Sequence, residues 1–196
     1  MPCGLQPTAG KAKPQGQRGD VSMSIQELQI EILAEIYRRY VKMEGDAWNV
    51  EGLAEEVGWE TGGVARIDDA VFALRDKGML EIIAMGPVVR TTWQGQEFVE
   101  ELAAKGKLTI EGGHMKLLEL QEKILVEVCR RYVNREGDVW EVRALVSEWG
   151  LEPVDRFRID DAVFALKDKG LLKIVASGPA VIITPRGQEV AEKLIG

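Results

Sequence analysis

The chain has 196 residues, of which 45% are hydrophobic, 29% charged and 6% aromatic, and its 25 basic and 32 acidic side chains give a net charge of −7. The apolar fraction is that of an ordinary globular protein, and no apolar run approaches the ~18 residues that a membrane helix needs, so neither wholesale disorder nor a membrane span is expected. The acidic balance argues against a protein that binds polyanions over its whole surface.

The N-terminal segment, residues 1–22, is rich in Pro, Gly, Gln and basic residues and poor in large apolar ones, which predicts a disordered tail. It lacks the apolar stretch of ~7–15 residues that a secretory signal contains. Cys3 and Cys129 are too few to form a disulfide framework, which favours a reducing compartment. We therefore expect a cytoplasmic protein.

Three helices are predicted after the tail. Apolar residues at helical spacing, among them Leu28, Ile32 and Ile36, predict a first helix over Ser24–Lys42. The same spacing and the glycines that follow predict a short second helix and a longer third helix, over Glu51–Val57 and Gly62–Lys77.

Two extended runs then predict a β-hairpin, Leu80–Ala84 and Val88–Thr91, joined by a turn at Gly86–Pro87. Thr92 is expected to cap a closing helix through its side-chain oxygen. Trp48, in a short extended piece before the second helix, is expected to anchor the core. These elements predict a mainly α chain with small β-hairpins, of the α+β class.

The whole pattern occurs twice. Residues 25–104 align with 117–196 at a shift of about 92 without a gap, with roughly 43 of 80 positions identical. The longest match is the nine-residue segment 66–74, which recurs as 158–166. A copy of about 80 residues is long enough to fold alone. We expect an internal duplication with two tandem domains and a linker, over 23–104, 117–196 and 105–116.

The order of elements (helix, short strand, two helices, hairpin, closing helix) resembles the winged helix-turn-helix superfamily. The run from the third helix into the hairpin, at 68–82 and again at 160–174, is similar to the "helix, Lys-Gly-Leu, strand" signature of winged-helix regulators. Thr184-Pro185-Arg186-Gly187 resembles the Thr-Pro-x-Gly start of their closing helix. The resemblance covers both repeats and implies tandem winged-helix domains, a fold that hosts both DNA readers and protein-binding modules.

In winged-helix DNA readers the third helix enters the major groove and the hairpin wing touches the backbone. Cations near these elements are therefore the candidate DNA-binding residues. The first repeat supplies only Arg66. In the second repeat, Arg156 and Arg158 are expected near base edges or phosphates, and Arg143 and Arg186 near the backbone. The turns of both wings carry no cation, which departs from wings that insert basic residues into a minor groove.

The two repeats differ in charge. Residues 23–106 carry a net charge of about −8, residues 107–196 about −1, and the tail about +2. Binding to a polyanion is therefore expected mainly through the second domain, and the basic tail is expected to assist by counterion release.

Some apolar side chains form an additional set of candidates. One stripe on the first helix consists of Ile30, Ala34 and Tyr37, at i, i+4 and i+7. Trp59 and Trp93 are replaced by other residues in the second repeat, and Phe157 is an aromatic residue at a position expected to be exposed. Such a surface would contact either the other repeat or a partner protein. The candidate interaction residues are Ile30, Tyr37, Trp59, Trp93 and Phe157.

Catalytic chemistry is not indicated. The single histidine, His114, lies in the linker, and the chain contains no Cys-x-x-Cys or phosphate-binding glycine motif. Adjacent aspartates such as Asp160 and Asp161 point about 100° apart on a helix, so they suit the helix dipole better than a metal ion. We expect no enzyme, no cofactor and no bound metal.

The sequence therefore predicts a DNA-binding protein, a transcriptional regulator or chromosome-associated factor, with duplex DNA as its partner. The alternative is a protein-interaction scaffold built from winged-helix domains without DNA binding. Tandem units of that kind occur in chromosome-condensation accessory subunits and RNA polymerase assembly factors, which the layout also resembles. The acidic charge and the cation-free wings favour the alternative, and the sequence leaves the oligomeric state open.

Overall fold

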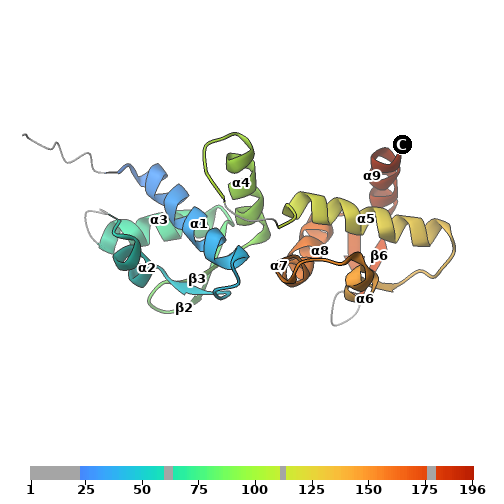
Figure 1. Cartoon of the computed structure of the whole chain (residues 1–196), viewed down its shortest axis with the longest axis horizontal. Helices are drawn as coiled ribbons and strands as arrows, with labels where there is room; N and C mark the ends of the chain where they lie inside the picture. Colours follow the sequence, from blue (N-terminus) through green and yellow to red (C-terminus); the bar gives the residue numbers. More distant parts are fainter. Residues whose placement is uncertain (1–22, 60–63, 111–113, 176–179) are drawn as a thin grey trace, which may run out of the picture.

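The computed structural model describes residues 23–59, 64–110, 114–175 and 180–196. It is mainly helical with two small three-stranded antiparallel sheets, which confirms the α+β class. The N-terminal and C-terminal halves lie side by side along the long axis (Figure 1). The expected disordered tail and the second Gly-Pro turn, at Gly178–Pro179, lie outside the described residues. Among the residues described, no helix is both long and apolar enough to cross a membrane.

The N-terminal half contains four helices and three strands within its described residues: α1 (Ile25–Val41), β1 (Trp48–Asn49), α2 (Val50–Val57), α3 (Val64–Asp76), β2 (Leu80–Ala84), β3 (Val88–Thr91) and α4 (Trp93–Ala104). The sheet order is β1-β3-β2, all antiparallel. Trp48 pairs with Val89, and Leu80 pairs with Thr91. Both hairpin strands thus begin and end where the sequence predicts.

Side chains determine where the first and last helices of this half begin. Ser24 and Glu27 form a capping box, in which the Ser24 hydroxyl accepts from the Glu27 N–H at 3.2 Å and the Glu27 carboxylate accepts from the Ser24 N–H at 2.8 Å. The Thr92 hydroxyl accepts from the Gly95 N–H at 3.2 Å, as predicted. A Cβ at Gly95 would overlap the Met79 carbonyl. α4 therefore packs against the backbone before β2 at a distance that only glycine permits.

The C-terminal half has the same sheet order, β4-β6-β5. Its elements are α5 (Leu117–Val133), β4 (Trp140–Glu141), α6 (Val142–Val146), a 3₁₀ turn η1 (Ser147–Trp149), α7 (Pro153–Phe157), α8 (Ile159–Asp168), β5 (Leu172–Ile174), β6 (Ala180–Ile183) and α9 (Pro185–Ile195).

The third helix is not continuous in this half, whereas the repeated pattern predicts one unbroken third helix in each repeat. It breaks at Arg158, which is both the last cap of α7 and the first cap of α8, with φ −85° and ψ −1°. Because of this break, α7 and α8 pack against different hydrophobic cores. Val154 on α7 packs against the N-terminal core, whereas Ile159 on α8 lies in the C-terminal core.

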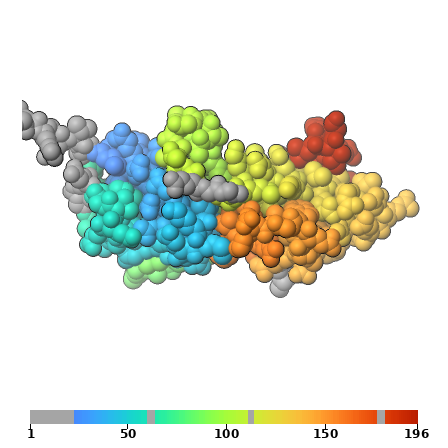
Figure 2. All heavy atoms as spheres, in the orientation of Figure 1, coloured from blue at the N-terminus to red at the C-terminus, as the bar shows by residue number. Residues whose placement is uncertain are grey.

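Each half has its own hydrophobic core. Trp48 is 8% exposed, which confirms it as a core anchor, and its counterpart Trp140 is 6% exposed in the C-terminal core. The halves also exchange side chains, because Trp93 on α4 packs against the C-terminal core and Val154 against the N-terminal one. The space-filling view shows the orange atoms of the C-terminal half against the blue and green atoms of the N-terminal half (Figure 2). The halves therefore meet through packed contacts as well as through the linker.

Candidate functional site

Arg158, the central candidate for DNA binding, is fully buried between the halves, with 0% of its side chain exposed. Its Nη2 donates to Glu100 Oε1, its Nη1 to the Met115 carbonyl at 2.7 Å, and its Nε to Gln96 Oε1 at 3.2 Å. Asp155 Oδ1 lies 3.9 Å from Nη1. A guanidinium with these partners has no face left for a phosphate or a base. The expected contact of Arg158 with DNA is therefore not possible in this arrangement, because the cation is used to join the halves.

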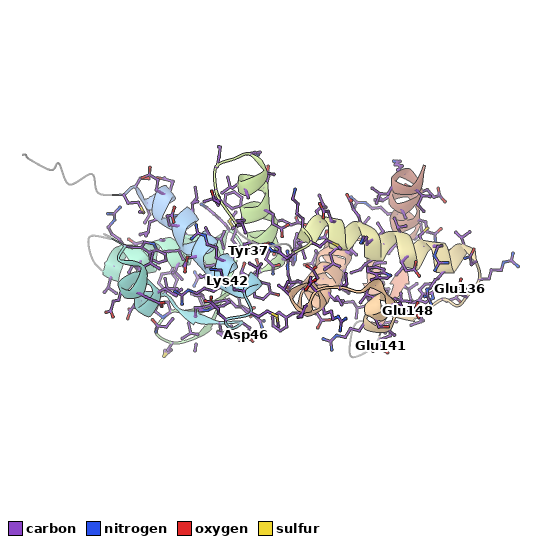
Figure 3. The ribbon with its side chains drawn as sticks, in the orientation of Figure 1. Tyr37, Lys42, Asp46, Glu136, Glu141 and Glu148 are labelled. Atoms are coloured by element: carbon purple, nitrogen blue, oxygen red, sulfur yellow. The ribbon has the colours of Figure 1, made fainter. Side chains whose placement is uncertain are left out.

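Glu100 collects donors from three elements. Its Oε1 accepts from the Tyr37 hydroxyl at 2.5 Å as well as from Arg158, and its Oε2 accepts from the Leu117 N–H at 2.8 Å. The Tyr37 hydroxyl also lies 3.0 Å from His114 Nε2. Tyr37 is labelled near the middle of the molecule in Figure 3 and is fully buried. Buried carboxylates are tolerated when their acceptor sites are filled in this way.

Burial and the neighbouring charges shift the pKa values of two groups beside this cluster. Burial lowers the pKa of His114 below its usual 6.5, and the Arg158 cation acts in the same direction against Glu100 and Asp155. Burial raises the pKa of Asp155, although the Met115 N–H and Arg158 both favour its charged form. The imidazole is therefore held in its neutral form near pH 7.

A second polar cluster joins the end of α1 to α8. The Tyr40 hydroxyl donates to Asp161 Oδ2 at 2.5 Å, and Gln96 Nε2 donates to the same oxygen at 2.8 Å. The Tyr40 ring packs against Phe157, with ring centroids 5.5 Å apart. Asp161 thus serves as an acceptor for two side chains of the N-terminal half, which explains its presence without a metal ion.

A third set of contacts lies at the start of α4. Trp93 Nε1 donates to Asp168 Oδ2 at 3.1 Å. Lys169 Nζ donates to Glu97 Oε1 at 2.6 Å and to Gln121 Oε1 at 2.8 Å, and it lies 5.4 Å from the centroid of the Trp93 ring. Tyr37, Trp93 and Phe157 were candidates for contact with either the other repeat or a partner, and all three face the other half.

The remaining candidate residues do not gather at one site, and they are exposed or half-buried. Arg143 is 60% exposed and pairs with Asp160, and the exposed Arg156 donates to the Leu151 carbonyl at 3.1 Å. Arg186 is exposed in the first turn of α9. The half-buried Arg66 donates to the Met23 carbonyl. Two further candidates, Ile30 and Trp59, are half-buried within the N-terminal half.

The face of the N-terminal half that would read DNA is apolar and acidic. In the N-terminal half, α3 and the hairpin line a groove of 620 Å³ that includes Glu51 and Asp68. Its apolar lining contains Phe72, Ile83 and Met85, which are 46%, 47% and 102% exposed. None of the sequence predictions included this patch. The signal was the excess of large apolar residues at the tip of the hairpin, where a wing normally has cations.

Sequence reasoning also missed the junction residues Gln96 and Glu100. Their only sequence signal is their spacing of four, which puts two polar side chains on one face of a helix that is otherwise apolar there.

Comparison of the chain with protein-family models, with curated proteins and with solved structures finds no match. A function for this chain is therefore inferred from the side chains at the junction and on the outer faces.

Proposed function

We propose that this chain is a protein-interaction module made of two tandem winged-helix units that arose by internal duplication. The junction holds the two units as one body, and partners bind on outer faces that are apolar and acidic. The observation that carries this proposal is the burial of Arg158 at the start of α8, since that helix end is the part of a winged-helix DNA reader that approaches the bases.

The surroundings of α8 support the proposal. Ile159 in its first turn is 3% exposed, and Asp161 accepts hydrogen bonds from Tyr40 and Gln96. Insertion of this helix end into a major groove would require the halves to separate. Separation would expose the apolar contacts of Trp93 and Val154 and would break the buried Arg158–Glu100 ion pair that joins the halves.

The outer face of α3 supports the proposal independently. A DNA-reading face needs cations because phosphates supply much of the affinity. Here the exposed Phe72, Ile83 and Met85 lie with Glu51 and Asp68. The nearby cation Arg75 stacks 4.9 Å from the Phe72 ring centroid and pairs with Asp76. An exposed apolar patch rimmed by acidic groups is typical of a protein-binding surface.

Duplex binding through the C-terminal half is the competing function, and a titration of the full chain with labelled duplex DNA distinguishes the two. At about 50 mM salt we expect a dissociation constant no tighter than about 10⁻⁴ M, the weak end of non-specific binding. Tight binding that weakens steeply between about 50 and 200 mM salt and is lost in Arg156→Glu with Arg186→Glu would overturn the proposal.

A pull-down with the full chain as bait tests whether the chain binds a protein. The full chain is expected to retain a stoichiometric protein partner, and Ile83→Lys with Met85→Lys is expected to release it. The control is Glu141→Lys with Glu148→Lys, at two exposed positions labelled on the C-terminal half in Figure 3, which changes the surface charge away from the patch. Equal loss in both variants would show that the apolar patch is not the binding face.

A further inference from the structure

The C-terminal half has an open apolar groove along α5. The groove has a volume of 680 Å³, and its apolar lining consists of Met115, Val126, Trp149 and Leu194. Leu194, on α9, is 44% exposed, and Val126 and Trp149 are half-buried. Charged side chains of α5 form its rim.

In the N-terminal half, part of the linker between the halves packs against the hydrophobic core. At the shift of 92 residues, Ile30 and Ala34 on α1 correspond to Glu122 and Val126 on α5. Ala34 is fully buried, and Ile30 is half-buried. After α4 the chain turns back, and Leu108 and Ile110 pack against the N-terminal core.

The two residues of this segment that pack against the core, Leu108 and Ile110, lie outside the helices. Leu108 and Ile110 are half-buried while Thr109 between them is exposed, which is the alternation of an extended chain that lies on an apolar surface. Further along the chain, His114 Nε2 lies 3.0 Å from the Tyr37 hydroxyl on α1. Figure 1 shows this stretch of chain arching from the end of α4. Two lysines, Lys105 and Lys107, precede the apolar pair.

We infer that the α5 groove is a docking site for an extended segment of a partner protein, with apolar side chains at alternate positions and lysines before them. This inference rests on the proposed interaction function and names the surface and the class of partner. The segment 105–110 is the example of that chemistry within the chain, because its two apolar residues, Leu108 and Ile110, pack against the core of the other half.

Charge favours a cationic occupant. Glu119 and Glu122 are exposed on the rim, and Lys123 is the cation beside them. Glu127 forms ion pairs with Arg130 and Arg131, at 2.7 Å each. Because these cations neutralise its charge, Glu127 contributes little to the negative potential at the groove. An acidic or a purely apolar segment would therefore bind less well than a lysine-containing one.

The test uses the full chain, labelled with ¹⁵N, and a synthetic peptide with the sequence of residues 103–110. Saturable shifts are expected at the Trp149 indole and at the amides of Val126 and Leu194, without change at Ala34. The matched peptide with Leu108→Asp and Ile110→Asp is expected to leave these signals unchanged. A copy of residues 105–110 appended after Gly196 raises the effective concentration and is expected to protect the same amides from hydrogen exchange.

A second experiment measures peptide binding after the charges on the groove rim are reversed. Glu119→Lys with Glu122→Lys is expected to weaken peptide binding about threefold to tenfold, the range for two exposed ion pairs. The control, Glu51→Lys with Glu55→Lys on α2, carries the same change of charge and is expected to alter binding by less than about twofold. Higher salt should weaken binding to the unmodified chain.

Three results would overturn the inference. They are the absence of saturable groove shifts for both the free and the appended segment, equal shifts with the aspartate peptide, and self-association of the chain through the groove, which would make the occupant a second copy. If duplex DNA does not bind and the peptide leaves the groove unperturbed, only this inference fails. Tight duplex binding overturns the proposed function whatever the peptide does.

Discussion

Arg158 and Glu100 face each other across the junction, and the guanidinium donates to the carboxylate where Arg158 is 0% and Glu100 8% exposed. One residue comes from the α7–α8 break and the other from α4, 58 positions earlier in the chain. The pair therefore links the two halves through a charge that water does not reach.

Arg158→Met is expected to lower the free energy of unfolding by about 3–5 kcal/mol, because it leaves the buried Glu100 without its cation. Arg158→Met with Glu100→Gln should cost less than the sum of the two single changes, since the uncompensated charge is gone. The measurement is denaturant unfolding. Arg143→Met is the control, and its exposed pair with Asp160 should be worth no more than about 1 kcal/mol. Equal losses for Arg158→Met and Arg143→Met would contradict the assignment.

Tyr40→Phe is expected to cost about 1–2 kcal/mol, because it removes the 2.5 Å hydrogen bond to Asp161 and leaves an acceptor with one donor fewer. The counterpart change Tyr132→Phe tests the same residue type in the other half. Tyr132 is 39% exposed at the end of α5, so its loss should stay within about 0.5 kcal/mol. If the two variants unfold at the same denaturant concentration, the Tyr40–Asp161 contact does not stabilise the junction.

The free energy of unfolding should decrease in mild acid because protonation of His114 is less favourable in the folded chain. Its pKa in the folded chain lies below 6.5, so the unfolded chain takes up the proton first. The free energy of unfolding is therefore unaffected above about pH 7.5 and decreases as the pH falls through about 6.5, and His114→Gln should flatten this part of the profile. The charged groups around the imidazole are Arg158, Glu100 and Asp155.

His114 is the single histidine, so its NMR titration is unambiguous. A pKa at or above 6.5 in the folded chain would contradict the prediction.

Gly95→Ala is expected to destabilise the chain by more than about 2 kcal/mol, because the added methyl group would overlap the Met79 carbonyl and crowd the Thr91 hydroxyl. Gly52→Ala in α2 is the matched control. The nearest atom to a Cβ there is 3.7 Å away, so alanine should be neutral or stabilise by about 0.5–1 kcal/mol. Thermal unfolding of both variants checks the pair, and a tolerated Gly95→Ala would show that α4 can move away from β2.

Local patterns were sufficient to place the hairpin and the closing helix of the N-terminal half. Strands β2 and β3 have the predicted bounds because alternation and a Gly-Pro turn act over a few residues. Thr92 caps α4 as predicted, since a cap involves only its own helix end. Trp48, expected in the core from its place in a short extended piece, is buried as predicted.

Local sequence patterns could not predict the contacts between the two halves. The segment 66–74 recurs unchanged as 158–166, yet its first residue has two different environments. Arg66 is half-buried and donates to the Met23 carbonyl, whereas Arg158 is enclosed by Glu100, Gln96 and Met115. Identical local sequence cannot distinguish the two. A cation is buried only where partners from distant elements meet it, and here those partners come from α4 and the linker. Tertiary packing therefore decided that Arg158 is fully buried, whereas Arg66 is only half-buried.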